Sequence, residues 1–578
     1  MGRLGGGAWS LALALCLAAV AAPVGAQQNA ILSPKERHHP VFAANGMVAS
    51  QEATASRIGV DILRRGGNAV DAAVAVGFAL AVTLPRAGNL GGGGFMLIHQ
   101  AASGETMALD YREMAPKAAK SDMYLDADGK VDRKRARFSY ASAGVPGSVA
   151  GLAAALKRYG TLPLATVIEP ALRLAERGFT VGHGLARALA KRRQRLGRWP
   201  STAAIFYRPD GSAYQAGDTL VQGDLAWSLR QIAERGAKSF YQGKIARRIA
   251  ADMAANGGLI SLADLAAYRV VWRQPVRGRY RGYQVASMPP PSSGGVHLIQ
   301  LLNILEGHDL SALGHNGADG IHLLAEAMKL AYADRARHLG DPDFWPVPVR
   351  GLTSKAYARG LAAGIDPARA RPSSAISHGD PAPHESHETT HFSIMDKAGN
   401  VVSNTYTINF SFGSGIVAAG TGILLNNEMD DFSAKAGTAN AYGLIGGEAN
   451  AIAPGKRPLS SMTPTIVFKA GRPVLATGSP GGSRIITMVL QIILNLVDHG
   501  LNIAEATAAA RIHHQWLPDK LFVERGLGPD TLALLRQRGH MVVESRAAGS
   551  VQSVMRTADG GFLGASDPRS IGALTIGY

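Results

Sequence analysis

Cysteine is almost absent from this chain: its 578 residues include one, Cys16, inside an apolar run from Trp9 to Ala22. A single cysteine cannot close an internal disulfide, so the stability of the fold must come from its hydrophobic core. With 46% hydrophobic residues, the chain is long enough to bury a substantial core. Leu15, rather than a small residue, precedes Cys16, which argues against lipid attachment at this cysteine.

An uncleaved membrane anchor is the less favoured alternative, because the apolar run is shorter than the ~20 apolar residues with which a helix spans a bilayer. Arg3 precedes the run, and Val24-Gly25-Ala26 follows it with small residues at the cleavage positions. This pattern is typical of a secretory signal peptide over residues 1–26, cleaved after Ala26. We therefore expect an exported chain, in the bacterial periplasm or secreted, with no stable membrane insertion after cleavage.

Aromatic residues are also scarce, at 6% of the chain, although the net charge is +17. The basic residues are spread along the sequence, and no aromatic residue interleaves with the one local cluster, AKRRQR at 190–195. Single-stranded nucleic acid is commonly bound by a basic groove with aromatic stacking partners. The composition therefore argues against a nucleic-acid partner and favours a solvated basic face that attracts anionic small molecules or envelope surfaces.

The glycine-rich stretch NLGGGGFMLIHQ at 89–100 lacks a phosphate-binding lysine. A P-loop would need that lysine and a helix directly after the glycines. The apolar residues that follow the glycines predict a strand instead. We interpret the stretch as a backbone crossing or the edge of a pocket.

The pattern of apolar residues changes along the chain. Two helices are predicted between Ala53 and Val82, the second so rich in Ala and Val that it should be buried, and residues 144–370 are predicted to be mostly helical. Residues 371–388, RPSSAISHGDPAPHESHE, have no apolar periodicity and indicate an exposed connector. Strand-like segments alternate with helical ones after it, which predicts an α+β fold with helix-covered sheets.

The pentapeptide HETTH at 387–391 matches the H-E-x-x-H signature of zinc proteases. Zinc binding by this signature needs a helix, which places the two imidazoles one turn apart. Two prolines just upstream, two β-branched threonines and a turn at 396–400 indicate a strand, in which residues four apart are separated by ~13 Å. We therefore expect no metal site here, even with a further ligand recruited from RIHHQW at 511–516.

The strand context supports another chemistry. If TTHFSIM and VVSNTYTIN form a hairpin around the turn at 396–400, Met395 pairs with Val401 and Thr407 faces Thr389. A cut between Glu388 and Thr389 would give Thr389 a free α-amine, whose pKa of ~7.7 to 8.0 suits it as the base for its own hydroxyl. That hydroxyl could make the cut by attacking the Glu388 carbonyl. On these residues alone, two ordinary strand threonines remain the alternative.

Long segments accompany this threonine, among them GMVASQEATASRIGVDILRRGGNAVDAAVA, DYREMAP, ETTHFSIMDKAGNVVSNTYTIN, GILLNNEMDDFSAKAG, NAIAPGKRPLSSMTPTIV, TGSPGGSRIIT and ASDPRS. They resemble the γ-glutamyltranspeptidase family (γ-glutamyltransferases or glutathione hydrolases), of the bacterial periplasmic type, over essentially the whole mature chain. The resemblance implies the N-terminal nucleophile hydrolase fold, a four-layer αββα sandwich with two stacked, mainly antiparallel sheets. It also implies a large subunit at 27–388 and a small subunit at 389–578, interleaved in one fold.

The resemblance assigns roles to individual residues. Thr389 matches the nucleophile exposed by cleavage after Glu388, and Thr407 matches the threonine that supports it. The other matching residues are Arg112, Ser460 and Ser461 for the substrate α-carboxylate, Asn409, Glu428 and Asp431 for its α-amino group, Gly481 and Gly482 for the oxyanion, and Tyr442 for the lid over the pocket. Glutamate at position 428 departs from the glutamine of many bacterial relatives, which changes the local charge.

The implied activity is hydrolysis of glutathione and other γ-glutamyl compounds, or transfer of the γ-glutamyl group to amino acids and peptides, through an ester on Thr389. No cofactor or metal is implied, and the partners are small molecules and the two subunits of one precursor. One alternative is a cephalosporin or glutaryl amide acylase on the same fold, against which Arg112, Asp431 and both serines argue. Others are a non-catalytic γ-glutamyl-binding protein that does not cleave itself, and a chelator-sensitive zinc protease.

Overall fold

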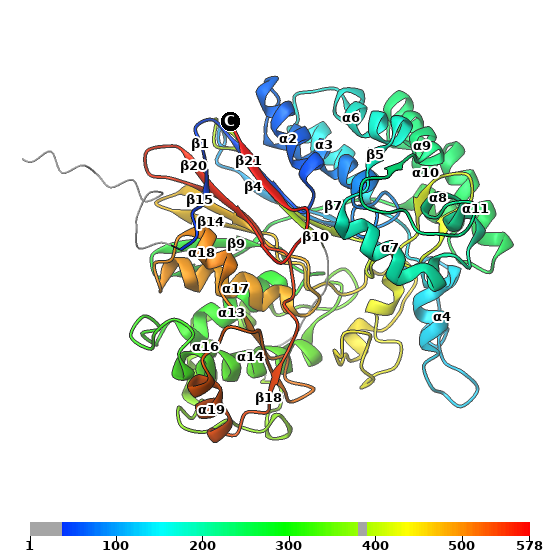
Figure 1. Cartoon of the computed structure of the whole chain (residues 1–578). Helices are drawn as coiled ribbons and strands as arrows, with labels where there is room; N and C mark the ends of the chain where they lie inside the picture. Colours follow the sequence, from blue (N-terminus) through cyan, green and yellow to red (C-terminus); the bar gives the residue numbers. More distant parts are fainter. Residues whose placement is uncertain (1–36, 380–389) are drawn as a thin grey trace, which may run out of the picture.

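The computed structural model describes residues 37–379 and 390–578, and two stacked seven-stranded sheets form its centre (Figure 1). Neighbouring strands are antiparallel throughout both sheets. The first sheet has the order β1 (Val41–Ala43), β20 (Phe562–Ser566), β19 (Gln552–Arg556), β15 (Arg472–Thr477), β14 (Thr465–Lys469), β9 (Tyr283–Ser287), β8 (Val276–Tyr280). The second has the order β21 (Leu574–Gly577), β2 (Met47–Ser50), β10 (Thr390–Met395), β11 (Val401–Thr407), β3 (Gly93–His99), β4 (Thr106–Tyr111), β7 (Val271–Arg273).

Helices cover the outer face of each sheet. The second sheet is covered by α2 (Ala53–Arg64), α3 (Ala69–Thr83) and α5 (Ser148–Tyr159), with α6 (Leu164–Arg177) and α9 (Gly223–Arg235) behind them. The first sheet is covered by α13 (Gly294–Leu305) and α18 (Ile503–Ala508), and α13 packs in turn against α14 (Ala318–His338), α16 (Lys355–Ala363) and α17 (Arg484–Val497). The predicted αββα sandwich is confirmed.

Smaller elements complete the chain. The remaining α-helices of the described ranges are α4 (Arg133–Phe138), α7 (His183–Leu196), α8 (Pro200–Phe206), α10 (Lys238–Tyr241), α11 (Lys244–Ala255), α12 (Leu262–Ala267), α15 (Val349–Leu352) and α19 (Pro529–Gln537). Short sheets pair β5 (Phe179–Thr180) with β6 (Thr219–Leu220), β12 (Val417–Ala418) with β13 (Ile423–Leu424), and β17 (Leu521–Val523) with both β16 (Ile512–His513) and β18 (Val542–Glu544). Within the described ranges, no helix combines the length and apolar character needed to cross a bilayer.

Successive side chains along each strand of the second sheet point to opposite faces of that sheet. In β10, Phe392 and Ile394 join the core shared with α3, whereas Met395 joins the core between the sheets. The helix α3 is apolar on all sides, and all 15 of its residues are buried, as the sequence predicts for a helix at the centre of a fold. The amide of Ala69 at its start donates to Asp396 Oδ2 (2.9 Å), which connects α3 to the turn of the β10–β11 hairpin.

The β10–β11 hairpin has the predicted register, with Met395 paired to Val401 and Thr390 paired to Tyr406. Its turn is closed by Asp396, whose carboxylate accepts from both the backbone N–H and the side-chain amide of Asn400. On the far side of β11, Thr407 pairs with Gly93 of β3. The alternating pattern and the short turn therefore fix which side chains of this hairpin share a face.

The glycine-rich stretch before β3 is a close backbone crossing, as predicted. A Cβ on Gly92 would lie 1.8 Å from the carbonyl oxygen of Thr407, so only glycine fits there. The side chain of Asn89 stabilises the same crossing, because its Nδ2 donates to the Thr407 carbonyl (2.9 Å) and its Oδ1 accepts from the Gly92 amide (2.9 Å). These contacts place the stretch beside the end of β11.

Residues 144–370 are mostly helical, as predicted, but they also contribute β7, β8 and β9 to the central sheets. Each central sheet combines strands from before and after position 389, because β1 to β4 and β7 to β9 precede it. The apolar residues after the glycines predict β3, but β4 was missed because it is buried on both faces and lacks the alternation that marks a half-exposed strand. The predicted connector at 371–388 includes a 3₁₀ turn at Ser373–Ala375 and extends into residues outside the described ranges.

Candidate active site

Arg112 follows directly after β4 and is the centre of a fully buried charge cluster. Its Nη1 lies 2.6 Å from Glu428 Oε1, its Nη2 lies 2.7 Å from Asp431 Oδ2, and its Nε donates to the carbonyl of Pro458 (3.1 Å). Glu428 and Asp431 are the ends of one 3₁₀ turn, in which residues three apart project from the same side. The structure thus brings together three of the predicted binding residues.

Glu113 belongs to the same cluster, and sequence reasoning missed it. Its carboxylate is fully buried, and its Oε2 lies 3.5 Å from Arg112 Nη1. Burial raises the pKa of Glu113 to about 7, although the Arg112 guanidinium opposes the shift. The signal that could have identified Glu113 was its position next to Arg112 in DYREMAP. Adjacent residues at the end of a strand commonly point to opposite faces of the sheet, so this position alone did not place Glu113 in the cluster.

The cluster holds three carboxylates against one guanidinium. Burial raises the pKa of Glu428 and of Asp431 well above the ordinary values, and for Asp431 the nearby Glu428 carboxylate adds to the rise. A ligand with an adjacent ammonium and carboxylate suits such a cluster, because its ammonium can pair with the acidic side chains while its carboxylate pairs with Arg112. The free head of an α-amino acid has this chemistry.

Ser460 and Ser461 are fully buried and follow the segment that borders the guanidinium of Arg112. The carbonyl of Leu459, one residue earlier, accepts from Arg112 Nη2 (3.4 Å). The main chain at Ser460 is held by Ser293, whose amide donates to the Ser460 carbonyl (3.0 Å). Both predicted serines therefore lie in the chain segment next to the charge cluster.

Thr407, Asn409 and Tyr442 form a chain of contacts that leads to this cluster. Thr407 Oγ1 accepts from the Asn409 amide (2.7 Å), and Asn409 has φ +67°, a left-handed conformation that asparagine tolerates. Asn409 Nδ2 donates to the carbonyl of Asn427 (3.0 Å), the residue before Glu428, and Asn409 Oδ1 accepts from the Tyr442 hydroxyl (2.5 Å). The predicted lid residue therefore contacts a predicted binding residue directly.

Gly481 and Gly482 lie between β15 and α17, with φ of +146° and +71°. In the described parts of the chain, no backbone hydrogen bond uses the N–H of either glycine. Ser483 Oγ donates to Gln515 Oε1 (2.7 Å), and Gln515 Nε2 donates to the carbonyl of Tyr442 (3.1 Å), which connects this loop to the predicted lid residue. Two free N–H groups in a loop that precedes a helix are suited to an oxyanion.

The predicted cleavage pair, Glu388 and Thr389, lies outside the described residues, as does the predicted leader at 1–26. The described chain resumes at Thr390, whose strand partner Tyr406 directly precedes Thr407. The structure therefore places Arg112, Glu428 and Asp431 in direct contact, and it connects Thr407, Asn409 and Tyr442 to them and to the Gly481–Gly482 loop.

The strand predicted in place of a zinc-binding helix is confirmed for residues 390–395. His391 uses both ring nitrogens within the core, Nδ1 with Thr405 Oγ1 (3.0 Å) and Nε2 with Ser393 Oγ (2.8 Å), and burial lowers its pKa to about 3. A separate buried group, His322, Glu326 and His540, has metal-ligand chemistry, but there the Lys329 ammonium lies 2.5 Å from Glu326 Oε1 and already supplies a cation.

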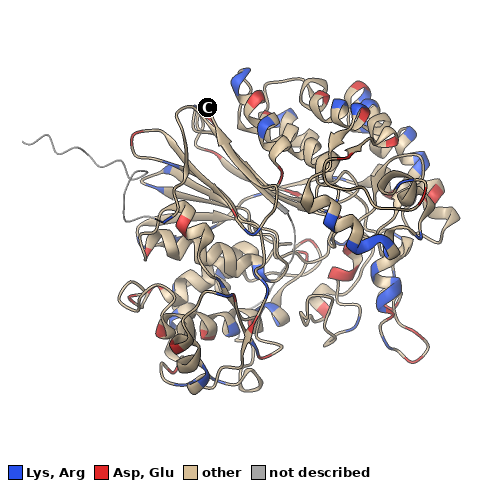
Figure 2. Cartoon of the chain, viewed as in Figure 1, with Lys and Arg blue, Asp and Glu red and all other residues tan. Residues whose placement is uncertain are grey.

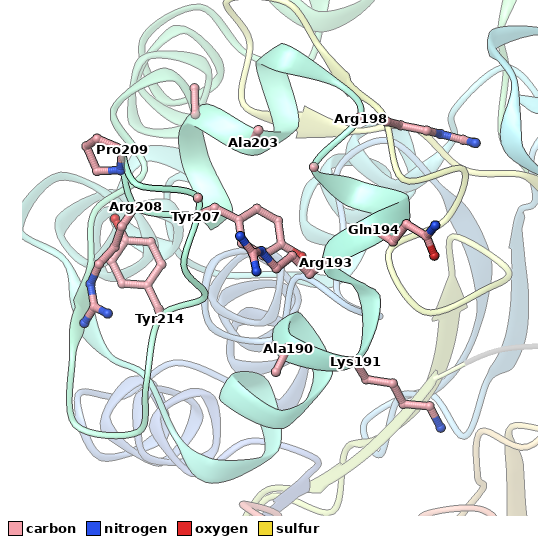
Figure 3. A pocket seen from close by; sticks show the side chains of 13 residues that line it. Ala190, Lys191, Arg193, Gln194, Arg198, Ala203, Tyr207, Arg208, Pro209 and Tyr214 are labelled. Atoms are coloured by element: carbon pink, nitrogen blue, oxygen red, sulfur yellow. The ribbon is translucent and has the colours of Figure 1, made fainter.

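The basic cluster at 190–195 lies on α7, and Figure 2 shows blue segments on α7 and on α4. A cavity of about 1140 Å³ lies between α7 and α8 and contains none of the predicted site residues. Figure 3 shows Lys191 and Arg198 extending away from it and Arg208 next to Tyr214. The guanidinium carbon of Arg208 lies 5.6 Å from the centroid of the Tyr214 ring. The cavity therefore belongs to a basic outer face, in agreement with the composition, and not to the charge cluster.

Comparisons with known proteins agree with this geometry. The family model described as gamma-glutamyltranspeptidase matches residues 55–576. The chain is 56% identical over 564 residues to the glutathione hydrolase proenzyme of Escherichia coli (strain K12), with 97% of both chains covered. It is 47% identical to the glutathione hydrolase proenzyme of Pseudomonas sp. (strain A14), with 93% of this chain and 95% of that one covered. The solved cephalosporin acylase from Bacillus halodurans superposes with a TM-score of 0.85 at 30% identity, over 95% of this chain and 99% of that one.

Proposed function

Since this chain belongs to the gamma-glutamyltranspeptidase family, we propose that it is a self-cleaving enzyme that hydrolyses glutathione and other γ-glutamyl compounds or transfers their γ-glutamyl group to amino acids and peptides. The observation that carries the proposal is the buried cluster of Arg112 with Glu428 and Asp431. The cluster offers charges opposite to those of the ammonium and carboxylate of a free α-amino acid head. A γ-glutamyl group has such a head, and a simple acyl chain lacks it.

The first step we propose is maturation of the precursor. The Thr389 hydroxyl attacks the Glu388 carbonyl, the C–N bond breaks, and the amide nitrogen takes the hydroxyl proton, which leaves Glu388 esterified to Thr389. Water then hydrolyses this ester, so Glu388 gains a free carboxylate and Thr389 regains its hydroxyl with a free α-amine. That amine is a base of suitable pKa next to the nucleophile.

The catalytic cycle repeats the same exchange on substrate. The α-amine of Thr389 takes the hydroxyl proton as Oγ attacks the γ-carbonyl carbon, and the N–H groups of Gly481 and Gly482 stabilise the oxyanion. The C–N bond breaks, the leaving amine receives the proton, and a γ-glutamyl ester remains on Thr389. Water or an acceptor amine attacks the ester and gives its proton back to Oγ through the α-amine. Thr407 supports the hydroxyl of Thr389.

The subunit and export assignments form part of the same proposal. Residues 1–26 would direct export to the periplasm or medium, and residues 27–388 and 389–578 would form the large and small subunits. Both central sheets combine strands from the two ranges, which supports a heterodimer that stays assembled after cleavage because separation would expose both cores.

A glutaryl donor separates this proposal from the acylase alternative, which the structural similarity to a cephalosporin acylase favours. Glutaryl-p-nitroanilide keeps the carboxylate of γ-glutamyl-p-nitroanilide and lacks only its ammonium. Loss of two charge-assisted contacts costs about 3 kcal/mol, so we expect kcat/KM to be about 100-fold lower for the glutaryl donor. Equal or better cleavage of the glutaryl donor would favour the acylase.

Donor affinity should depend on pH through the carboxylates around Arg112. Glu113, Glu428 and Asp431 must be ionised to pair with the donor ammonium, and burial raises the pKa of all three, that of Glu113 to about 7. The KM for γ-glutamyl-p-nitroanilide should therefore increase as the pH falls below about 7 and should level off at higher pH. Steady-state kinetics between pH 5.5 and 9 measure this dependence.

The variant Glu428→Gln tests the cause of that dependence. Burial and like-charge repulsion from the Glu428 carboxylate both raise the pKa of Asp431, so neutralising Glu428 should move the acid limb of the KM profile to lower pH. The pH dependence of kcat is set by the ionisation of the α-amine of Thr389 and should be the same in the variant as in the unmodified enzyme. A KM profile that does not move would show that these carboxylates do not govern donor binding.

A further inference from the structure

A cationic cavity of about 350 Å³ lies next to the predicted oxyanion loop. Its lining includes Pro480 and Gly481, together with Arg86 and with Gly184 and Arg187 from the start of α7. No carboxylate is present among the described residues that line it. The cavity therefore combines a predicted catalytic backbone group with uncompensated positive charge.

Two of the three arginines in this cavity are available to a ligand. Arg569 is engaged within the protein, because its Nη2 lies 2.5 Å from Glu524 Oε2 and its Nη1 lies 3.1 Å from Asp567 Oδ1. In the described ranges, by contrast, the guanidinium groups of Arg86 and Arg187 form no hydrogen bond or ion pair. Arg86 is partly buried and Arg187 is exposed.

The backbone fixes Arg86 close to the catalytic segment. The carbonyl of Arg86 accepts from the amide of Phe412 (3.0 Å), three residues after Asn409. Three residues after Arg86, Asn89 donates to the carbonyl of Thr407. The chain segment that carries Arg86 is therefore connected at two points to the loop that leaves β11.

On these observations we propose that Arg86 and Arg187 form a subsite for a carboxylate on the leaving amine, and on the acceptor amine that replaces it. The inference rests on the proposed function, in which Gly481 stabilises the oxyanion and Arg112 holds the opposite, α-amino acid end of the donor. The substrate class it selects is γ-glutamyl amides whose leaving amine is an amino acid or peptide with a free carboxylate. The leaving peptide of glutathione has such a carboxylate.

One subsite serves both partners for a chemical reason. The acceptor amine attacks the ester carbon along the path by which the leaving amine departed, because deacylation by an amine is the reverse of acylation. An acceptor dipeptide therefore places its carboxylate where the leaving dipeptide had its own. Burial, together with the neighbouring Arg192, lowers the pKa of Arg86, and a bound carboxylate would offset both effects.

The test uses two donors that differ by one carboxylate, γ-glutamyl-p-nitroanilide and γ-glutamyl-3-carboxy-4-nitroanilide. The measured quantity is the kcat/KM of the carboxylated donor divided by that of the other. In Arg86→Gln this ratio should fall about 10-fold relative to the unmodified enzyme, because a charge-assisted contact is lost. Arg187→Gln, on the exposed side, should lower the ratio about 3-fold.

Arg235→Gln is the matched control, because Arg235 is exposed in the last turn of α9 and the change removes the same charge. Its donor ratio should equal that of the unmodified enzyme. A ratio that stays constant in Arg86→Gln, or that falls equally in Arg235→Gln, would overturn the subsite. Absence of cleavage of both donors by the unmodified enzyme would instead reject the proposed function itself.

The acceptor reaction gives a second readout of the same subsite. With γ-glutamyl-p-nitroanilide as donor, glycylglycine should be a better acceptor than glycylglycinamide, which lacks the carboxylate. Arg86→Gln should reduce this preference about 10-fold, since the only difference between the acceptors is the group that the arginine contacts. A preference that persists unchanged in the variant would contradict a shared subsite.

Discussion

Replacing Thr389 with alanine is expected to give a single uncut chain without measurable γ-glutamyl hydrolysis. The variant lacks the hydroxyl that attacks Glu388 and therefore also lacks the α-amine that cleavage would expose. Thr389 makes the cut with its hydroxyl and then provides both the nucleophile and, through its α-amine, the base. Activity should therefore fall by about 1,000-fold or more. Gel electrophoresis and the release of p-nitroaniline measure the two effects.

The control for this prediction is Thr389→Ser, which keeps a hydroxyl and, after cleavage, an α-amine. It should be cut into chains 27–388 and 389–578 and should retain part of the activity. Cleavage at the same position in Thr389→Ala would show that another group, or another protease, makes the cut. Full activity in an uncut Thr389→Ala chain would rule out the proposed mechanism.

Replacing Arg112 with glutamine is expected to have the next largest effect. The side chain contacts Glu428 and Asp431 and would bind the donor carboxylate, so its loss removes the only cation in direct contact with these two buried carboxylates among the described residues. Removing one partner of a buried charge pair costs about 2 to 5 kcal/mol, and kcat/KM for γ-glutamyl-p-nitroanilide should fall about 1,000-fold. Most of the loss should be in KM.

A conservative variant distinguishes binding from folding in this test. Arg112→Lys keeps the charge but loses the planar guanidinium that also donates to Pro458. Its kcat/KM should therefore lie between the values of the unmodified enzyme and of Arg112→Gln. Thermal unfolding of the processed variants shows how much of each loss comes from instability. A folded, processed Arg112→Gln enzyme with unchanged KM would contradict a role for Arg112 in donor binding.

The hairpin at 390–407 was predictable because the turn at 396–400 is short and fixes which residues pair, without any tertiary information. The buried helix α3 was predictable for a similar reason, since a helix that is apolar on every side has no face for water. Strands such as β4 were missed because both of their faces are buried, and burial on both faces removes the periodicity that identifies a strand.

The charge cluster could not be derived from the residues alone. Arg112 meets Glu428 and Asp431 across more than 300 positions of sequence, and only the tertiary fold brings the residue after β4 next to the 3₁₀ turn after β13. The resemblance of motifs supplied this set, but it gave no reason to include Glu113. Arg86 was missed because its neighbours at the predicted oxyanion loop are far away in sequence and because an isolated arginine carries no motif.

The most direct test of the account is the mass of the enzyme trapped during turnover. The purified enzyme is mixed with γ-glutamyl-p-nitroanilide, quenched in acid and analysed as intact chains and as peptides. We expect two chains, with the smaller beginning at Thr389 and carrying one γ-glutamyl group on the peptide that starts with this residue. A single uncut chain, or a γ-glutamyl group on any other residue, would contradict the claim that Thr389 is a self-generated nucleophile.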